Sequence, residues 1–369
     1  MDRDQLLALR TATSSSSSAD VPLPTAAPVV CRNDARGGIV STTGVAGLTL
    51  GGGIGWLHRK WGLACDNLLG AEIVTADGQL LRVSGSQHED LFWALRGGGG
   101  NFGVVTAFEF AAHELGPIVM AAAPIYGVDA ADDVMRAWRA WTETVPDEVT
   151  SRAVFWSMPE DPSLPPAVHN QEVLILGALY AGSADEGETL LQPIREFATP
   201  LADLSGEMPY RMFQAAFDPF FPKGEIASYW KSTYLQALND DAIDLVVKRA
   251  RSRLSPLTLL HVPLMGGATS RVGVTETAFG DRSAPYMLSV DGNWVEPDHD
   301  QAEISWVRET IDEAQRFSSG TYLNFGGDEP DASAAVEAAF GENLPRLREI
   351  KQKYDPQNLF RLNNNISSG

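Results

Sequence analysis

Two glycine-dense segments are the parts of this chain whose residue types and spacing could hold a ligand. The first covers residues 41–55, and the second covers residues 96–103, which read Arg-Gly-Gly-Gly-Gly-Asn-Phe-Gly. Because glycine has no side chain, its backbone N–H can approach a flat ring or a pyrophosphate closely, and consecutive N–H groups can form an anion-binding nest. The two segments together predict a cofactor cradle built from two loops.

Glycine runs also occur in tight turns and bulges, so a purely structural interpretation of each segment stays open. Neither segment is a phosphate-binding loop that ends in Gly-Lys-Ser/Thr. Residues 51–55 also lack a Rossmann-type acidic residue about twenty positions further on, unless Glu72 takes that role. The pattern therefore disfavours a nucleoside-triphosphate site or an NAD site.

The elements that must position these loops begin with strands. Residues 70–83 read as two strands joined by an Asp77-Gly78 hairpin turn, and residues 104–110 alternate in polarity as a further strand. The second glycine segment is expected to open directly into that last strand. The first module is therefore predicted to be rich in strands and in glycine.

Between residues 117 and 320 the pattern becomes mixed. Apolar positions at helical spacing alternate with strand-like apolar runs, which predicts a sheet covered on one side by helices. The helices are expected at 134–145 and 243–254, and the strands at 174–180, 257–265 and 286–290. A last amphipathic helix is expected over 344–354, where Asp355-Pro356 stops it.

Composition narrows the possible partners and compartment. The formal net charge is -20, and a field of that sign repels nucleic acids and anionic membranes. Two cysteines, Cys31 and Cys65, are too few for a disulfide framework, which favours a reducing, cytoplasmic compartment. No apolar run has the length of a transmembrane helix, and no secretion signal is readable. The six histidines lack the pairing of a metal site.

Four segments in order resemble bacterial members of the berberine-bridge family of FAD oxidases. They are residues 41–67, 90–106, 320–325 with its Tyr-x-Asn-Phe motif, and the ending 354–366. The resemblance implies an α+β protein in which part of a PCMH-type FAD-binding domain precedes a substrate domain with an antiparallel sheet covered by helices. It divides the chain into a disordered low-complexity stretch (1–36), the C-terminal part of the FAD-binding domain (37–115), the substrate domain (116–340) and a returning C-terminal segment (341–369).

The resemblance also assigns flavin contacts position by position. The first glycine segment of the family passes beside the isoalloxazine ring, the second lines the FAD channel, and the closing asparagines lie near the flavin. Tyr322 matches a position on a strand that faces the flavin, and it is the expected catalytic residue. The expected cofactor-binding residues are Thr42, Thr43, Gly44, Gly47, Gly51, Gly53, Asn67, Gly98, Gly99, Asn101, Gly103, Val105, Asn324, Asn363 and Asn365.

The activity that the resemblance implies is oxidation of an alcohol or amine. A base takes the proton while hydride passes to flavin N5, and O2 or another acceptor takes the electrons. Tyr322 could be that base or a core tyrosine with a bonded hydroxyl. His261 and Arg282 are left outside the catalytic set, because a lone histidine in an apolar strand is commonly a satisfied buried residue.

Departures from the family pattern concern how the flavin is held. The Arg-Gly-Gly-Gly-His motif, whose histidine bonds covalently to the flavin in the family, is absent, so the resemblance implies an N-terminally truncated member. Val40 occupies the position of a second anchoring cysteine, and Leu48 that of a nearby histidine. Non-covalent FAD and a small-molecule substrate are therefore expected. The alternative is an inactive remnant or binding protein without a complete flavin site.

Overall fold

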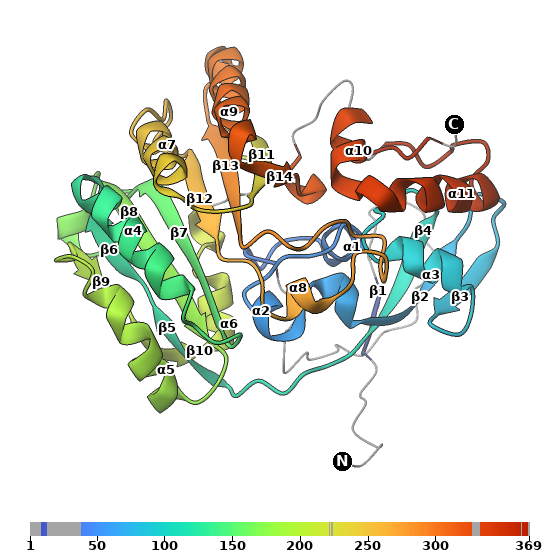
Figure 1. Ribbon diagram of the computed structural model, residues 1–369, viewed down its shortest axis with the longest axis horizontal. Coiled ribbons are helices and arrows are strands. Elements are labelled where there is room, and N and C mark those ends of the chain that lie inside the picture. The colour runs from blue at the N-terminus through green and yellow to red at the C-terminus, as the bar shows by residue number, and fades with distance from the viewer. Residues whose placement is uncertain are drawn as a thin grey trace.

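The computed structural model describes residues 9–12, 38–220, 222, 224–326, 333–362 and 364–367, with the backbone alone for 9–12. Two regions lie side by side, each built on its own antiparallel sheet (Figure 1). Helices α1 (Val45–Leu50), α2 (His58–Trp61) and α8 (Ala268–Arg271) lie between them. The expected α+β class, with an antiparallel sheet covered by helices, is confirmed.

The first region contains a four-stranded sheet in the order β1-β4-β2-β3. Its strands are β1 (Leu9–Ala12), β2 (Leu68–Val74), β3 (Leu80–Ser84) and β4 (Val104–Phe110). The predicted hairpin is confirmed: β2 pairs with β3, and Gly78 takes a φ of 80° in the turn. Strand β1 lies in the stretch 1–36 that was expected to be disordered, and the rest of that stretch lies outside the described residues.

Three helices pack into the apolar core of the first region together with its sheet. Helix α3 (Glu89–Leu95) shares one apolar core with α10 (Ser333–Phe340) and with α11 (Leu344–Tyr354). Leu91 of α3 and Leu347 of α11 are both fully buried in that core. The last helix was predicted with these bounds, and its packing brings the end of the chain back to the first region.

The second region is a 10-stranded antiparallel sheet within the described residues, with β10-β5-β8-β7-β12-β13-β11-β14 in order. Strands β6 and β9 lie off this path, β6 pairing with β8 and with β9. The strands are β5 (Ile118–Ala122), β6 (Pro124–Gly127), β7 (Val149–Ser157), β8 (Glu172–Tyr180), β9 (Ala202–Asp203), β10 (Gly206–Pro209), β11 (Ala227–Leu235), β12 (Leu259–Pro263), β13 (Tyr286–Trp294) and β14 (Ser318–Gly320). The helices are α4 (Ala131–Thr142), α5 (Ala184–Leu191), α6 (Tyr210–Ala215), α7 (Asp240–Ala250) and α9 (Asp300–Ala314).

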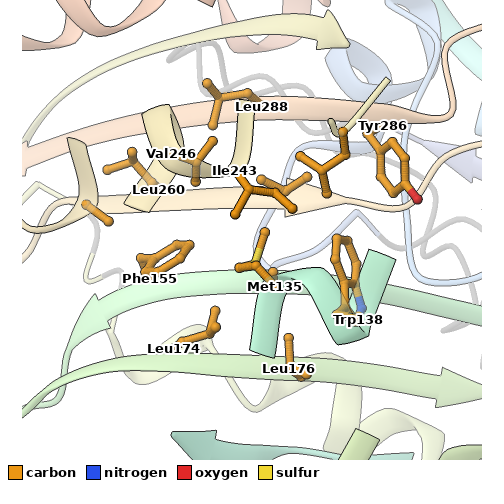
Figure 2. Close-up of a cluster of buried hydrophobic side chains, with 14 of the residues drawn as sticks. Met135, Trp138, Phe155, Leu174, Leu176, Ile243, Val246, Leu260, Tyr286 and Leu288 are labelled. Carbon is orange, nitrogen blue, oxygen red and sulfur yellow. The ribbon is translucent and has the colours of Figure 1, made fainter. Parts of the chain in front are cut away.

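One face of this sheet packs against α4 and α7 (Figure 2). Because side chains alternate along a strand, every second residue of β7, β12 and β13 points to these helices, as Phe155, Leu260 and Leu288 do. The residues between them point to the opposite face, toward the first region. The predicted helices and strands of this region are confirmed, but α7 ends at Ala250, so Leu254 lies beyond it and is exposed.

Candidate active site

A cavity of about 240 Å³ lies between residues 38–48 and the sheet face that points away from α4 and α7. Strands β7, β12 and β13 form its floor, and η8 (Leu323–Phe325) with the preceding tyrosine closes one wall. Mostly apolar residues with a few polar groups form the lining, which is usual for a small-molecule site. They are Gly38, Ile39, Val40, Thr42, Thr43, Leu48, Ile54, Arg152, Val154, Phe217, Trp230, Leu259, His261, Asp291, Tyr322 and Phe325.

Tyr322 is buried, and its phenolic oxygen accepts three hydrogen bonds. The backbone N–H groups of Gly53 and Ile54 donate at 3.1 and 3.2 Å, and the Asn324 amide donates at 2.9 Å. Burial raises the pKa of Tyr322, and these three hydrogen bonds oppose the shift. Donors that converge on one oxygen stabilise negative charge there, as in an oxyanion hole. The three donors thus lower the free energy of forming the Tyr322 phenolate in this buried position.

Part of the first glycine segment leaves a surface free of side chains. A Cβ added to Gly44 or Gly47 would meet nothing within 4 Å. Thr42 and Thr43, which precede these glycines, line the cavity. These four of the expected flavin contacts therefore lie together, along the edge of the cavity where α1 begins.

The remaining glycines of that segment allow protein elements to approach each other. A Cβ on Gly51 would overlap the Asn324 amide, and a Cβ on Gly53 would overlap the Ala64 side chain. The Asn324 amide also donates to the Leu48 carbonyl at 3.1 Å. Gly51, Gly53 and Asn324 therefore act on the site by positioning the donors around Tyr322.

The second glycine segment meets the first but does not line the cavity. The Gly99 N–H donates to the Leu50 carbonyl at 2.9 Å, which joins the two segments behind α1. A Cβ on Gly98 would overlap the Ala94 carbonyl, and a Cβ on Gly103 would overlap the Val74 carbonyl. The structure thus places these glycines at close contacts between protein elements.

Asn101 connects this segment to the end of the chain. Its amide donates to the Asn364 carbonyl at 3.1 Å, and its side-chain oxygen accepts the Ile366 N–H at 3.0 Å. The Asn365 side-chain oxygen is buried and has no partner among the described residues. Asn363 lies outside the described residues. The closing tail therefore runs next to the second glycine segment, with one buried amide oxygen left for a ligand.

Two further expected contacts lie away from the cavity. The Asn67 amide donates to the carbonyls of Trp61 and Leu63 at 2.9 and 2.8 Å, and its oxygen contacts His113. Val105 is buried in β4, within the apolar core of the first region. The hydrogen bonds of Asn67 hold the turn η1 (Ala64–Asn67) in place, and the structure does not bring either residue into the cavity lining.

The residues of the sheet floor were not among the expected site residues: Arg152 and Asp291 were not identified from the sequence, and His261 was set aside as a buried histidine. Arg152, His261 and Asp291 line the cavity from β7, β12 and β13, and each is more than nine-tenths buried. Burial lowers the pKa of Arg152 to about 9, against the opposing charge of Asp291. A charged or polar residue at an alternate position of an otherwise apolar strand was the available signal, because such a position must point to one defined face.

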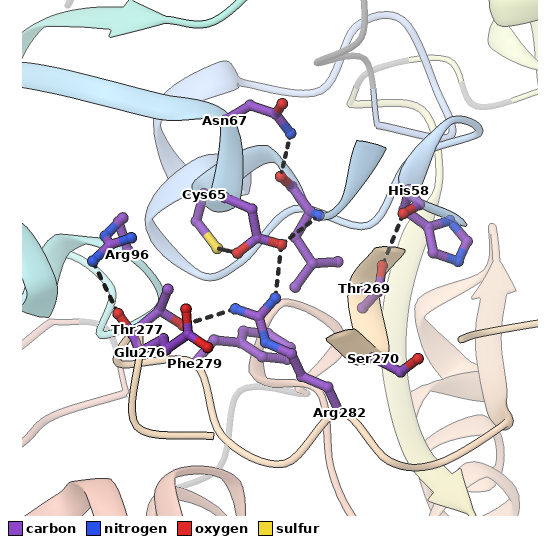
Figure 3. Close-up of polar contacts among 12 residues, drawn as sticks. His58, Cys65, Asn67, Arg96, Thr269, Ser270, Glu276, Thr277, Phe279 and Arg282 are labelled. Carbon is purple, nitrogen blue, oxygen red and sulfur yellow. Dashed lines mark hydrogen bonds and ion pairs between the residues drawn. The ribbon is translucent and has the colours of Figure 1, made fainter. Parts of the chain in front are cut away.

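A polar network joins the loop 276–282, which follows α8, to the first region (Figure 3). Arg282 forms an ion pair with Asp66 at 2.7 Å and donates to the Thr277 hydroxyl at 2.7 Å. The Cys65 thiol contacts Asp66, and burial raises the pKa of this thiol, so it is held protonated. Arg282 and Cys65 therefore have a structural role.

The ring end of a flavin fits the described residues. The side-chain-free surface at Gly44 and Gly47 adjoins the cavity, and the buried side-chain oxygens of Thr49 and Asn365 have no partner among the described residues. Ligand pockets usually measure about 300–1,000 Å³, so a cavity of about 240 Å³ has room for one small molecule, and a flavin ring would lie along its edge at α1. The phosphate and adenine parts of FAD would therefore lie outside it.

Other classes of site find no support in the described part of the chain. No group of three or more His, Cys, Asp or Glu side chains there could hold a metal ion. The helices described are also too short or too polar to cross a membrane.

Comparisons with known proteins agree with this geometry. A sequence profile described as FAD binding domain matches residues 34–84, and one described as Berberine and berberine like matches residues 321–367. An uncharacterized FAD-linked oxidoreductase of Bacillus subtilis, YgaK, is 31% identical over 339 residues, covering 89% of this chain and 71% of its own.

Solved structures carry the same fold. The BBE-like 1 protein of Physcomitrella patens superposes with a TM-score of 0.77 at 22% identity, over 90% of this chain and 72% of its own. A chitooligosaccharide oxidase superposes with a TM-score of 0.75 at 22% identity, over 92% of this chain and 74% of its own. On the profile matches, the relative and the fold, the chain belongs to the berberine-bridge-like family of FAD-linked oxidoreductases and is an FAD-dependent oxidase or dehydrogenase.

Proposed function

We propose that this protein oxidises an alcohol or amine carbon of a small molecule held in the cavity, with Tyr322 as the base. The bound FAD would supply the hydride acceptor at N5 and pass the electrons to O2 or another acceptor. The single observation that carries the proposal is the phenolic oxygen of Tyr322, which lies in the cavity wall and accepts three N–H donors.

The proton path follows from these donors. The phenolic oxygen of Tyr322 is the acceptor in these three hydrogen bonds, which suits a phenolate better than a phenol with two lone pairs. The substrate O–H or N–H would give its proton to this oxygen, and the amides of Gly53, Ile54 and Asn324 hold the oxygen in place. Removing the proton concentrates electron density on the carbon that loses hydride.

Non-covalent attachment of FAD is part of the proposal. Val40 and Leu48 line the cavity, and neither side chain can form a bond to a flavin. Cys65, the free cysteine of the described residues, is buried in contact with Asp66 and lies outside the cavity lining. The side-chain-free surface at Gly44 and Gly47 supports a ring held by contact alone.

The test uses the purified full-length protein saturated with FAD under anaerobic conditions. It is mixed with alcohols, amines and fractionated small-molecule cell extract, and the visible flavin band is followed. The proposal expects one fraction to bleach the band, to yield a product two hydrogens lighter by mass spectrometry, and the band to return with an acceptor. Bound FAD that no fraction reduces would contradict it, and a chain that takes up no FAD would favour the binding-protein alternative.

A further inference from the structure

We propose that the cavity floor is a binding site for an ionised carboxylate of the substrate, with the Arg152 guanidinium as its donor. The floor cluster is defined as Arg152, His261 and Asp291. That the bound carboxylate belongs to a substrate rests on the proposed function. Carboxylate binding itself does not, because it can be measured without turnover.

The three side chains share one face of three adjacent strands. His261 of β12 pairs with Val154 of β7 and with Ser289 of β13. Arg152 and Asp291 each lie two residues along from those partners, so both are diagonal neighbours of His261 on the same face. All three members of the floor cluster line the cavity.

Arg152 is a buried cation without a close partner. Its Nε and Nη2 atoms are both buried, and neither has a hydrogen-bond partner among the described residues. These two N–H groups lie on the same edge of the guanidinium, which is the fork that binds a carboxylate through two parallel hydrogen bonds. An unpaired buried charge is costly, so such a group in a native fold needs a partner that the chain itself does not supply.

The surroundings of Arg152 leave that edge without a partner among the described residues. The Trp56 ring stacks on the guanidinium at 4.3 Å from centroid to carbon, which occupies one face. No ion pair joins Arg152 to Asp291 within the described residues, and both Asp291 oxygens bond to other groups. One accepts the Ser289 hydroxyl at 2.5 Å, and the other contacts His261 Nε2 at 3.0 Å.

His261 is held next to Arg152 by Asp291. Its Nε2 bonds to the carboxylate of Asp291, and its Nδ1 is buried without a partner among the described residues. The bond to Asp291 fixes the orientation of the imidazole ring. Nδ1 is therefore a second unpaired polar atom of the cavity floor.

The apolar lining selects a carboxylate on an apolar body. Val154, Leu259 and Trp230 surround the floor cluster, and they would solvate a phosphate or a free sugar poorly. The Phe325 ring stands between the two ends of the site, 6.2 Å from the His261 ring and 5.1 Å from the Tyr322 ring. Arg152 and Tyr322 both line the cavity, so a substrate anchored at Arg152 would lie in the same cavity as Tyr322.

The experiment is calorimetric titration of the full-length protein with benzoate and with benzyl alcohol, its neutral analogue. The wild type should bind benzoate about tenfold or more tightly than benzyl alcohol. Arg152→Met should abolish that preference, and Arg152→Lys should keep only part of it because the fork is lost. Arg82→Met, which removes an exposed arginine paired with Glu109, is the matched control and should bind like the wild type.

Thermal unfolding separates ligand recognition from a structural role of Arg152. Removal of an unpaired buried charge should raise the Tm of the ligand-free protein by about 2 °C or more, whereas loss of a structural arginine would lower it. Equal binding of the two probes, benzoate affinity retained in Arg152→Met, or a lowered Tm would each overturn the proposal. A protein that binds benzoate through Arg152 but oxidises no alcohol or amine would refute the proposed function and leave this site standing.

Discussion

At Tyr322, burial and hydrogen bonding act in opposite directions on one oxygen. Burial raises the pKa of the phenol, while the N–H groups of Ile54, Asn324 and Gly53 favour the ionised form. Since the pKa stays above its ordinary value of about 10, the resting group is protonated at neutral pH. Its basic form becomes more populated as pH rises, so a reaction that uses it should speed up with pH.

Tyr322→Phe tests this role directly. The substitution should lower the rate of flavin reduction by about 100- to 10,000-fold, the usual contribution of a general base, while FAD uptake is unchanged. Stopped-flow reduction measured from neutral to alkaline pH should rise in the wild type and stay flat in the variant. Tyr234→Phe is the control, because Tyr234 is buried in the same apolar cluster and its hydroxyl has no hydrogen-bond partner in the described part of the chain. Equal rates in wild type and Tyr322→Phe would remove Tyr322 from the reaction.

The sequence analysis predicted residues of one wall of the cavity but none of the residues of its floor. Tyr322, Thr42 and Thr43 were found by resemblance to a family motif, and they line the cavity. Arg152 and Asp291 lie in strands that had to be paired before their faces could be known, and no motif marked them. Their alternation with apolar neighbours indicates that they lie on one face of a strand. It does not indicate which residues of the neighbouring strands lie next to them.

Some glycines are required because two protein segments approach each other closely, and not because a ligand does. Gly97 has a φ of 120°, and a Cβ there would overlap the backbone of Phe279. The Phe279 N–H donates to the Arg96 carbonyl at 3.1 Å, so this contact joins the second glycine segment to the loop 276–282. The sequence analysis predicted a cofactor loop at residues 96–103 and did not predict this close contact with a segment that is distant in the chain.

Gly97→Ala and Gly78→Ala separate steric overlap from backbone strain. Both glycines have positive φ, but a Cβ on Gly78 meets nothing within 4 Å. Gly78→Ala should cost about 1–2 kcal/mol from strain alone, and Gly97→Ala about 1–3 kcal/mol more, since the backbone of Phe279 must shift. Urea denaturation measures both free energies of unfolding. The same loss in the two variants would show that the Phe279 contact adjusts freely.

Lys351 fastens the closing tail to the first region. Its ammonium is fully buried and donates to the Asn101 carbonyl, the Asp355 carboxylate and the Phe360 carbonyl at 2.8, 2.6 and 2.8 Å. The Asp355 carboxylate also accepts the N–H groups of the residues that follow the helix. This one side chain therefore links α11, the second glycine segment and the tail.

Lys351→Met should be far more damaging than Lys353→Met. Removing one partner of a buried pair leaves Asp355 uncompensated, which costs about 3–5 kcal/mol. Lys353 lies two residues further on, is 60% exposed and pairs with Asp90, so its loss should cost no more than about 1 kcal/mol. Thermal and urea unfolding of the two variants provide the comparison, and similar stabilities would mean that the buried pair contributes little.

At the scale of the whole molecule, the regular elements were predictable and their assembly was not. Local periodicity predicted the β2–β3 hairpin, α4, α7 and α11, since each depends on neighbouring residues. The order of a 10-stranded sheet depends on pairings between distant segments, which local patterns do not encode. The cavity forms only where that sheet meets the first region, so its floor became visible only with the fold.

The central claim is that the cavity edge at α1 holds a flavin ring by contact alone. Gly47→Leu adds a large side chain at that edge, where a Cβ meets no atom of the described residues within 4 Å, so the fold should persist. The decisive measurement is the visible absorption spectrum of wild type and Gly47→Leu after FAD saturation and desalting, before and after acid precipitation. The wild type should retain a flavin band that acid releases to the supernatant, and Gly47→Leu should retain none. A colourless wild type, equal retention in both proteins, or colour that stays in the precipitate would contradict this account.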